Sequence, residues 1–386
     1  MSIIAGLDIG STKVAEVIAR IAPSGDIEII GIGEAPCQGL RRGLVTDIDS
    51  VAGAIKLANK RACHTARLDV RRVYVGVPAT HITSVGSRGV TAVSSPDGVI
   101  TSADVKRALD AAGVLAVPSD REIISVLPRE YIVDGVGGIR DPEGMTGIRL
   151  EVDARVIMGQ ATVLENITAS VARAGLAIGG LVLDPIAVAE AVLTPDEMER
   201  GVILVDVGGQ ITQVVSFCEG GPVQFAWVPA GGVHVTNDIA VGMKVPVEQA
   251  ESMKKQGELA DSLLQTIIDA RLREILELVD VETREVRNKG LAPCGLVFAG
   301  GGSLIPGLLD LAGEILGLPA RIGGPVDTKS PRGRDGQRLS STALGIVEYV
   351  ANDSVFGLSR EMKPSPVREM FSAVRGWFAD FVKDFF

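Results

Sequence analysis

One pattern occurs twice in the chain and limits the possible folds more than any other feature. The segments AGLDIGSTKVAEVIA (5–19) and ILVDVGGQITQVVSF (203–217) each contain an apolar strand, an aspartate, a glycine-containing turn and a second strand. They lie about two hundred residues apart. A strand–turn–strand unit repeated at this distance predicts two similar lobes that face one another.

The segments around these units predict a mixed α/β fold. Apolar runs at 3–9, 14–21 and 27–35 have the character of strands, and 50–62 has helical spacing. Between 83 and 164, short β-like pieces flank one helix, which indicates an inserted α+β module. A chain of 386 residues is long enough for two lobes with ample cores.

Charge and residue usage exclude several classes of protein. The net charge is −10 and the basic residues form no stripe, so we expect no nucleic-acid partner. The three histidines lack metal-ligand spacing, and the four cysteines form no Cys-x-x-Cys pair. No run of eighteen apolar residues occurs, so no membrane-spanning helix is expected.

The repeated turns have the chemistry of a phosphate site. Asp8 and Asp206 are predicted at two strand ends, where a Mg²⁺ ion bound to phosphates would find oxygen ligands. The glycine turns that follow offer backbone N–H groups to a phosphate. Ser11 and Thr12 add hydroxyl groups and Lys13 adds a positive charge. Taken alone, either turn is better explained as an ordinary Asp-Gly hairpin, because such hairpins are common.

Two further motifs fit a nucleotide without proving one. FAGGGSLIPG (298–307) follows an apolar strand, and its glycines admit either a flat ligand or a tight strand-to-helix turn. Glu251 and Lys254 lie three residues apart on one helix face, where they could reach ribose hydroxyls or form a surface ion pair.

In sequence order these pieces resemble the actin-like ATPase superfamily, in which a nucleotide is clamped between two lobes. The closer resemblance is to the bacterial cell-division protein FtsA family, and it covers almost the whole chain. It is carried by segments such as GLRRGLVTDIDS (39–50), YVGVPATHI (74–82), AESMKKQG (250–257) and GLVFAGGGSLIPGL (295–308).

The resemblance implies an α/β actin-like fold of two duplicated, ribonuclease-H-like lobes, with an inserted α+β subdomain and a C-terminal amphipathic helix. The expected boundaries are a lobe I core at 1–82 and 165–197, an inserted subdomain at 83–164, a lobe II core at 198–232, a shortened lobe II tip at 233–291, the rest of lobe II with the return to lobe I at 292–351, a linker at 352–366 and a tail helix at 367–386.

The resemblance also implies roles for individual residues toward ATP and Mg²⁺. The first phosphate contact falls on Asp8, Gly10, Ser11, Thr12 and Lys13. The second falls on Asp206, Gly208, Gly209 and Thr212. The ribose contact falls on Glu251 and Lys254, and the adenosine contact on Gly300, Gly301, Gly302 and Ser303. Asp8 and Asp206 would face the metal, and Asp184, with Asp206, would act at the catalytic position, where Asp184 orients the attacking water.

The chain departs from the family pattern in two places. The second phosphate loop reads DVGGQIT, with Gln210 in place of a third glycine and Ile211 where a hydroxyl is usual. Because phosphoryl transfer depends on positioning, we expect slow or absent hydrolysis. After Gly257 the family carries β structure that is almost missing here, which shortens the lobe II tip. Arg271 and Arg273 are candidate partner contacts or solvated charges.

The last twenty residues have one apolar face. On a helical wheel the apolar side chains of 367–386 fall within one half, and the charged side chains fill the other. Lys363-Pro364-Ser365-Pro366 precedes them as a linker. A helix of this pattern lies in a membrane interface or packs on protein, and we favour the membrane. The predicted lipid contacts are Phe371, Val374, Trp377, Phe378, Phe381, Val382, Phe385 and Phe386.

The resemblance therefore implies a polymerising, ATP-binding adaptor on the cytoplasmic face of the cell membrane at the division site. Its expected partners are the C-terminal peptide of the tubulin-like protein FtsZ, copies of itself, membrane lipid and other division proteins at 83–164. The alternatives are an adaptor of another membrane machine, such as pilus assembly, and a sugar-kinase-type phosphotransferase. A chaperone-type ATPase is disfavoured because no peptide-binding domain follows.

Overall fold

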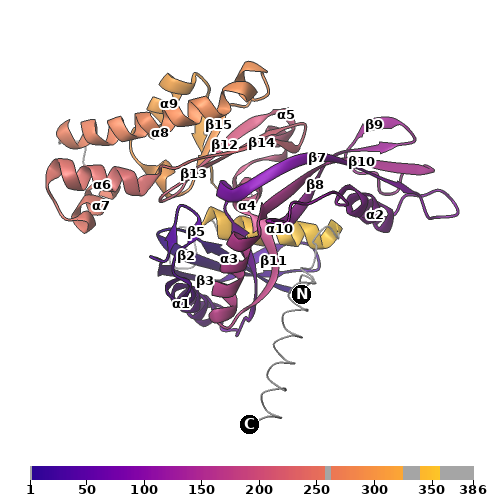
Figure 1. Ribbon diagram of the computed structural model, residues 1–386, viewed down its shortest axis with the longest axis horizontal. Helices are drawn as coiled ribbons and strands as arrows, with labels where there is room; N and C mark the ends of the chain where they lie inside the picture. Colours follow the sequence, from indigo (N-terminus) through magenta and orange to yellow (C-terminus); the bar gives the residue numbers. More distant parts are fainter. Residues whose placement is uncertain (1, 257–261, 325–339, 357–386) are drawn as a thin grey trace, which may run out of the picture.

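The computed structural model describes residues 2–256, 262–324 and 340–356, with side chains as far as Asn352. Figure 1 shows two lobes that meet along a central junction and a smaller subdomain that projects to one side. The predicted tail helix and its lipid-contacting residues lie outside the described residues.

Lobe I is built on a five-stranded sheet with the order β11-β6-β1-β2-β3. The first three strands are antiparallel, and β6 and β11 run parallel to β1. Helices α1 and α3 cover one face of the sheet, and α4 and α10 cover the other. The strands are β1 (Ser2–Ile9), β2 (Lys13–Ile21), β3 (Ile27–Pro36), β6 (Arg72–Val77) and β11 (Ala177–Leu183), and the helices are α1 (Ile48–Ala66), α3 (Ala161–Arg173), α4 (Asp184–Val192) and α10 (Ser341–Phe356).

The sequence of lobe I explains these elements. Strand β1 is apolar over consecutive residues because helices bury both of its faces. Helix α1 begins after Asp47, whose carboxylate accepts a hydrogen bond from the N–H of Ser50, and its buried side includes Val51 and Ile55. The short hairpin of β4 (Leu40–Arg41) and β5 (Leu44–Val45) precedes it.

Lobe II repeats this plan. Its sheet has the order β14-β13-β12-β15-β16, with β12, β13 and β14 antiparallel and β15 and β16 parallel to β12. The two sheets therefore share strand order and direction, which confirms the duplication expected from the sequence. The strands are β12 (Val202–Val207), β13 (Thr212–Cys218), β14 (Gly221–Val228), β15 (Leu296–Ala299) and β16 (Ala320–Ile322).

Helices cover the outer face of the lobe II sheet and share one apolar core with it. Between β14 and β15, the part of the chain that the structure describes contains helices and no strand. The helices of this lobe are α5 (Pro195–Arg200), α6 (Gly232–Met243), α7 (Val247–Gln256), α8 (Ser262–Asn288), the 3₁₀ helix η2 (Gly301–Leu304) and α9 (Leu308–Leu316).

The inserted subdomain is a four-stranded antiparallel sheet, β7-β10-β8-β9, with helix α2 packed against it. It leaves lobe I after the 3₁₀ helix η1 (Ala79–His81) and returns at α3. Its edge also touches lobe II, where Arg129 pairs with Glu219 at 3.2 Å and Arg140 pairs with Glu199 at 2.5 Å. Its elements are β7 (Ile82–Ala92), α2 (Ser102–Ala112), β8 (Arg121–Val133), β9 (Val136–Ile139) and β10 (Arg149–Gln160).

Helices α4 and α10 join the lobes. Side chains of α4 share a core with strands of lobe II, and α10 packs on β1 and β2 of lobe I. The two helices touch at Gly345, where an added methyl group would lie 1.6 Å from the carbonyl oxygen of Ala187, so only glycine fits.

Helix α10 also corrects one expectation. It continues to Phe356, so residues 352–356 of the predicted linker are helical. Asn352 and Asp353 do not break a helix that is already formed, and the first strong breaker in the sequence is Gly357. No helix among the described residues is both long enough and apolar enough to cross a bilayer.

Candidate functional site

The repeated units form two matching hairpins, one in each lobe. In the first, the N–H of Gly10 donates to the carbonyl of Lys13 at 3.0 Å, and in the second the N–H of Gly208 donates to the carbonyl of Ile211 at 3.0 Å. Each hairpin carries its aspartate two residues before the turn, at the end of β1 or β12. The same local geometry therefore presents Asp8 and Asp206 from opposite lobes.

The tips of the two hairpins meet across the junction. A methyl group added to Gly209 would lie 2.6 Å from Cγ2 of Thr12 and 3.6 Å from Oγ of Ser11. The structure thus brings together the predicted phosphate contacts Gly10, Ser11 and Thr12 with Gly208 and Gly209.

Three carboxyl groups gather beside these tips. Asp184 begins helix α4, and both it and Asp206 are 8% exposed, whereas Asp8 is half-buried. Burial raises the pKa of Asp206 to about 7, and the charge of Asp8 adds to the rise. Burial, followed by the charges of Asp8 and Asp206, raises the pKa of Asp184 well above its usual value.

These carboxyl groups have few partners in the protein. Oδ2 of Asp8 accepts a hydrogen bond from Oγ of Ser340 at 2.7 Å, which lowers its pKa against the larger effect of burial. Among the described residues, Oδ1 of Asp184 is buried without a hydrogen-bond partner. A buried orphan oxygen beside two further carboxyl groups is a polar arrangement that a ligand cation would complete.

The carboxyl groups fit Mg²⁺ only together with other oxygen donors. The described residues contain no group of three or more His, Cys, Asp or Glu side chains that could hold a metal ion by themselves. Mg²⁺ commonly keeps water and phosphate oxygens alongside one or two carboxylates. Asp8 and Asp206 suit that mode, and the cation would supply charge neutralisation for phosphate oxygens.

Glu251 and Lys254 on α7 face the first turns of α6. Nζ of Lys254 lies 2.6 Å from Oε2 of Glu251 and donates to the carbonyl of Gly232 at 3.1 Å. Burial acts to raise the pKa of Glu251, but the hydrogen bonds from Lys254 and Thr236 and the charge of Lys254 together outweigh it, so the pKa lies below its ordinary value. Because Gly232 donates its N–H to the carbonyl of Gly208 at 2.9 Å, this pair adjoins the second phosphate loop.

The glycines at 300–302 differ in how closely they are packed. Gly300 has φ +79°, and an added methyl group would lie 2.3 Å from Oδ1 of Asp206. Gly302 packs equally closely against Val207, with 2.4 Å from an added methyl group to its Cγ1. By contrast, a methyl group added to Gly301 would meet nothing within 4 Å. Ser303 is buried and donates to the carbonyl of Gly300 at 2.7 Å.

Two predicted phosphate contacts are engaged elsewhere. The Lys13 ammonium forms an ion pair with Glu34 on the neighbouring strand β3. The Thr212 hydroxyl is fully buried and donates to the carbonyl of Ala230 at 2.8 Å. The candidate partner contacts Arg271 and Arg273 also have carboxylate partners, in Asp238 at 2.6 Å and Glu314 at 3.1 Å.

Gln213 belongs to the site although the motifs did not predict it. Its amide oxygen accepts the N–H of Ala79 at 2.6 Å, and its hydrogen bonds lower the pKa values of Asp184 and Asp206 against the larger effect of burial. The side chain therefore ties the carboxyl groups to the start of the inserted subdomain. A polar residue in the apolar strand TQVVSFC, paired in register with Asp206, was the available signal.

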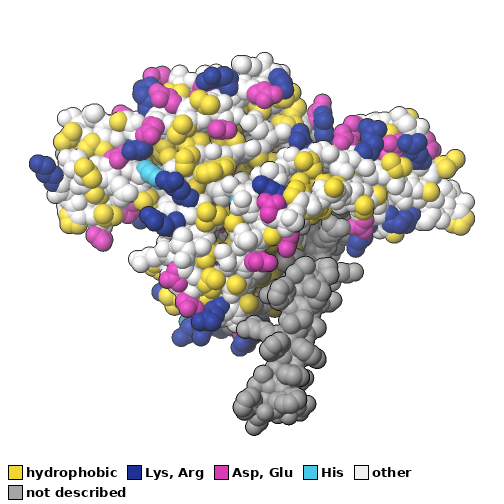
Figure 2. Space-filling model, viewed as in Figure 1, with side chains coloured by type: hydrophobic (Ala, Val, Ile, Leu, Met, Phe, Trp, Pro, Cys, Tyr) yellow, Lys and Arg dark blue, Asp and Glu magenta, His cyan; other side chains and the backbone are white. Residues whose placement is uncertain are grey.

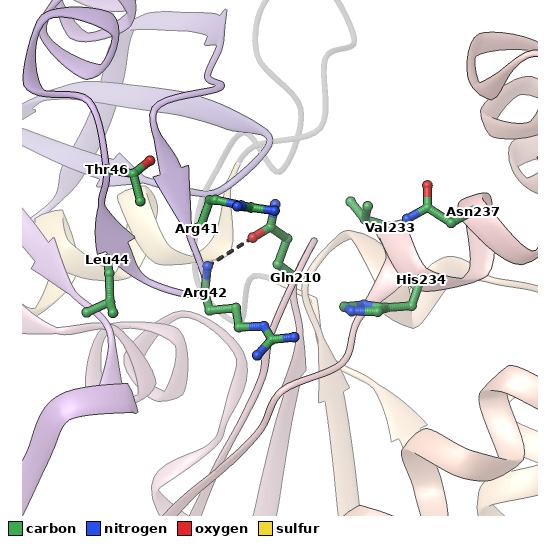
Figure 3. A pocket seen from close by; sticks show the side chains of 8 residues that line it. All are labelled: Arg41, Arg42, Leu44, Thr46, Gln210, Val233, His234 and Asn237. Atoms are coloured by element: carbon green, nitrogen blue, oxygen red, sulfur yellow. Dashed lines mark hydrogen bonds between the residues drawn. The ribbon is translucent and has the colours of Figure 1, made fainter.

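A pocket of about 560 Å³ opens beside the second phosphate loop (Figure 3). Gln210 lines it together with Arg41 and Arg42 of the β4–β5 hairpin and with side chains of α6. None of the predicted nucleotide-binding residues is among its lining residues.

Comparisons with known proteins agree with this architecture. A family model described as "SHS2 domain inserted in FTSA" matches residues 79–158, and one described as "Cell division protein FtsA" matches residues 203–345. The chain is 33% identical to the cell division protein FtsA of Pseudomonas aeruginosa, over 94% of this chain and 92% of that protein. It is 32% identical to the FtsA of Borreliella burgdorferi, over 98% of each chain.

Solved structures show the same fold at lower identity. A structure of a PilM-PilN type IV pilus biogenesis complex matches with a TM-score of 0.63 and 18% identity, over 92% of this chain and 99% of that one. MreB5 of Spiroplasma citri bound to ADP matches with a TM-score of 0.53 and 12% identity, over 92% and 98%. The two lobes thus have the actin-like fold, and the chain belongs to the cell division protein FtsA family.

Proposed function

We propose that the chain binds ATP with Mg²⁺ between its lobes and works as an FtsA-type adaptor in cell division. The observation that carries the nucleotide proposal is the meeting of two glycine hairpins from opposite lobes beside three poorly neutralised carboxyl groups. A nucleotide–metal complex would supply the missing positive charge and acceptors for the hairpin N–H groups. The ADP bound to MreB5 of Spiroplasma citri, a protein of the same fold, supports a nucleotide in this chain.

Hydrolysis in this site is proposed to be slow or absent. The Thr212 hydroxyl donates to the carbonyl of Ala230, so it is not directed to a phosphate. Gln210 stands in place of a third glycine, and its amide oxygen is held by the N–H of Arg42. Asp184, with its unpartnered oxygen, is the group proposed to orient a water. A nucleotide held without efficient water positioning would act as a structural or regulatory ligand.

The adaptor role draws on the family and on the sequence of the tail. The apolar face of 367–386 is proposed to insert into the inner surface of the cell membrane, while the lobes self-associate and hold the FtsZ C-terminal peptide. The inserted subdomain is the proposed contact for other division proteins. Since the charges of the tail nearly cancel, apolar insertion rather than lipid charge would drive binding.

Liposome co-sedimentation tests the tail. Full-length protein should pellet with vesicles with and without ATP, and residues 1–362 should stay in solution. Substituting Trp377→Glu and Phe378→Glu together should release the protein and leave nucleotide binding unchanged. The matched control, Arg368→Gln with Lys383→Gln, changes the net charge equally but keeps the apolar face. Vesicle binding by both the truncated and the Glu-substituted protein would contradict the tail proposal.

An FtsZ C-terminal peptide distinguishes the division adaptor from a pilus-type adaptor, which the likeness to the PilM–PilN structure keeps as the second candidate. Capture of the chain by the peptide supports the first, and absence of capture with intact nucleotide binding favours the second. A sugar-kinase function has less support, because it gives no role to the apolar face of the tail at 367–386.

A further inference from the structure

The pocket beside the second phosphate loop carries positive charge from lobe I. Arg41 and Arg42 extend from the β4–β5 hairpin toward Gln210 and His234 (Figure 3). Within the residues that the structure describes, no carboxylate pairs with either guanidinium group, and the lining contains no Asp or Glu. Figure 2 shows Lys and Arg side chains with a histidine where the two lobes meet on this face. In a chain of net charge −10, such a pocket is a local site for an anion.

Lobe II faces these arginines with side chains that can donate hydrogen bonds. His234 accepts the N–H of Gly231 at Nδ1, at 3.1 Å, so its Nε2 remains for a ligand. The amide oxygen of Gln210 is occupied by the N–H of Arg42, which leaves its NH₂ group as a donor. Asn237 completes this side.

The pocket adjoins the place that the proposed function gives to the phosphates. Gln210 follows Gly209 in the second loop, and the N–H of Val233, which lines the pocket, donates to the carbonyl of Gly209 at 2.8 Å. A phosphate group in the pocket would contact both lobes at once. The planar guanidinium fork matches phosphate oxygens better than any other side chain does.

We propose that this pocket is a phosphate-group subsite at the mouth of the inter-lobe cleft, with Arg41 and Arg42 as its cationic contacts and His234 as the opposing donor. The inference rests on the proposed nucleotide site. The phosphate group comes either from the terminal phosphate of the bound nucleotide or from free phosphate held beside a diphosphate.

Calorimetric titration of the full-length chain tests the subsite and separates the two sources. The ligands are ATP, ADP, ADP with inorganic phosphate, and inorganic phosphate alone, each with Mg²⁺. The variant is Arg41→Gln with Arg42→Gln. Arg67→Gln is a control for the loss of one exposed arginine, because Arg67 has φ +55° against +49° for Arg42 and lies outside the pocket.

If the terminal phosphate occupies the subsite, the double variant loses about tenfold or more in ATP affinity and less than twofold in ADP affinity. If free phosphate occupies it, phosphate tightens ADP binding in the wild type and the control but not in the double variant. Arg41→Lys with Arg42→Lys keeps the charge but not the fork, and should give an intermediate loss.

A double variant that matches the wild type in all four titrations overturns the subsite and leaves the nucleotide site standing. A wild type that binds phosphate through these arginines but binds no nucleotide supports the subsite and contradicts the nucleotide proposal. A wild type that binds none of the ligands contradicts both.

Discussion

The side-chain amide oxygen of Gln210 in lobe II accepts a hydrogen bond of 2.9 Å from the backbone N–H of Arg42 in lobe I. The bond crosses the junction next to the meeting hairpins. We predict that Gln210→Ala speeds amide exchange at Arg42 by about threefold to tenfold, since an exposed hydrogen bond contributes about 0.5–1.5 kcal/mol. Hydrogen-exchange mass spectrometry of peptides covering 40–46 measures this. Gln210→Glu retains the acceptor and should protect the amide, and equal exchange in all three proteins would contradict the bond.

Neighbouring glycines should respond differently to one methyl group. Gly300→Ala places a Cβ 2.3 Å from Oδ1 of Asp206 at φ +79°, so we expect a loss of about 2 kcal/mol or more in the free energy of unfolding. Gly301→Ala meets open space and should change it by less than about 0.5 kcal/mol. Urea denaturation compares them. If Gly301→Ala lowered the free energy of unfolding more than Gly300→Ala, the close packing at Gly300 and the open space at Gly301 would be contradicted.

Nucleotide binding should weaken in acid through Asp206. Its pKa of about 7 lies above the ordinary value of 3.8, so the carboxyl group is mostly protonated below pH 7 and must lose its proton to face a cation. We predict about tenfold weaker Mg²⁺-dependent ATP binding at pH 6 than at pH 8. Asp206→Asn should bind weakly with little change over this range. ATP itself also titrates in this pH range, so the two proteins must be compared. If ATP binding by the wild type depends on pH no more steeply than binding by Asp206→Asn, Asp206 does not cause the pH dependence.

Glu16 should make the protein less stable as pH rises. Its side chain is fully buried and burial raises its pKa to about 7, although Asn59 donates to it at 3.0 Å. Between pH 4.5 and 7 the unfolded chain loses this proton and the folded chain keeps it, so unfolding becomes easier. The loss should reach about 3 kcal/mol above pH 7. Glu16→Gln should raise the melting temperature at pH 8 but not at pH 4. If the substitution shifts the melting temperature equally at both pH values, the raised pKa of Glu16 is refuted.

The ion pairs that hold the inserted subdomain to lobe II should be weak and sensitive to salt. Arg140 and Glu199 are each about half-exposed, and a double-mutant cycle to alanine should give a coupling of about 0.2–1 kcal/mol that disappears in 1 M NaCl. Arg321 and Glu197 form the comparison, since two bonds of 2.6 and 2.8 Å join them and Glu197 is 17% exposed. Their coupling should be larger and survive salt. Equal couplings would mean that exposure does not govern these pairs.

The duplicated lobes could be predicted because short, contiguous sequence segments specify the repeated strand–turn–strand unit. Each unit places apolar strands, an aspartate and a glycine turn within about fifteen residues, and the two sheets follow the same plan. Helix α6 was harder to predict, because glycines and β-branched residues in GVHVTNDIAVGM disguise its period. The first five residues of the predicted linker proved helical because nothing before Gly357 ends α10.

The candidate site, like the fold, could be predicted only where local sequence determines it. The carboxyl positions of Asp8, Asp184 and Asp206 follow from strand and helix ends that the sequence marks. The partners of Lys13 and Thr212 depend on which strand or loop lies beside them, and Glu34 and Ala230 are chosen by tertiary packing. The bond of Gln210 to Arg42 joins residues 168 positions apart, which no local pattern announces.

The inserted subdomain joins lobe I through β7 and β10, and two ion pairs connect its side to lobe II. It therefore projects from its base like a lever. Strand β10 has twelve residues and is about 40 Å long. A tilt of ~5° at its base would carry its far end through about 3.5 Å. A small rotation of the subdomain at its base would therefore be amplified at its outer tip.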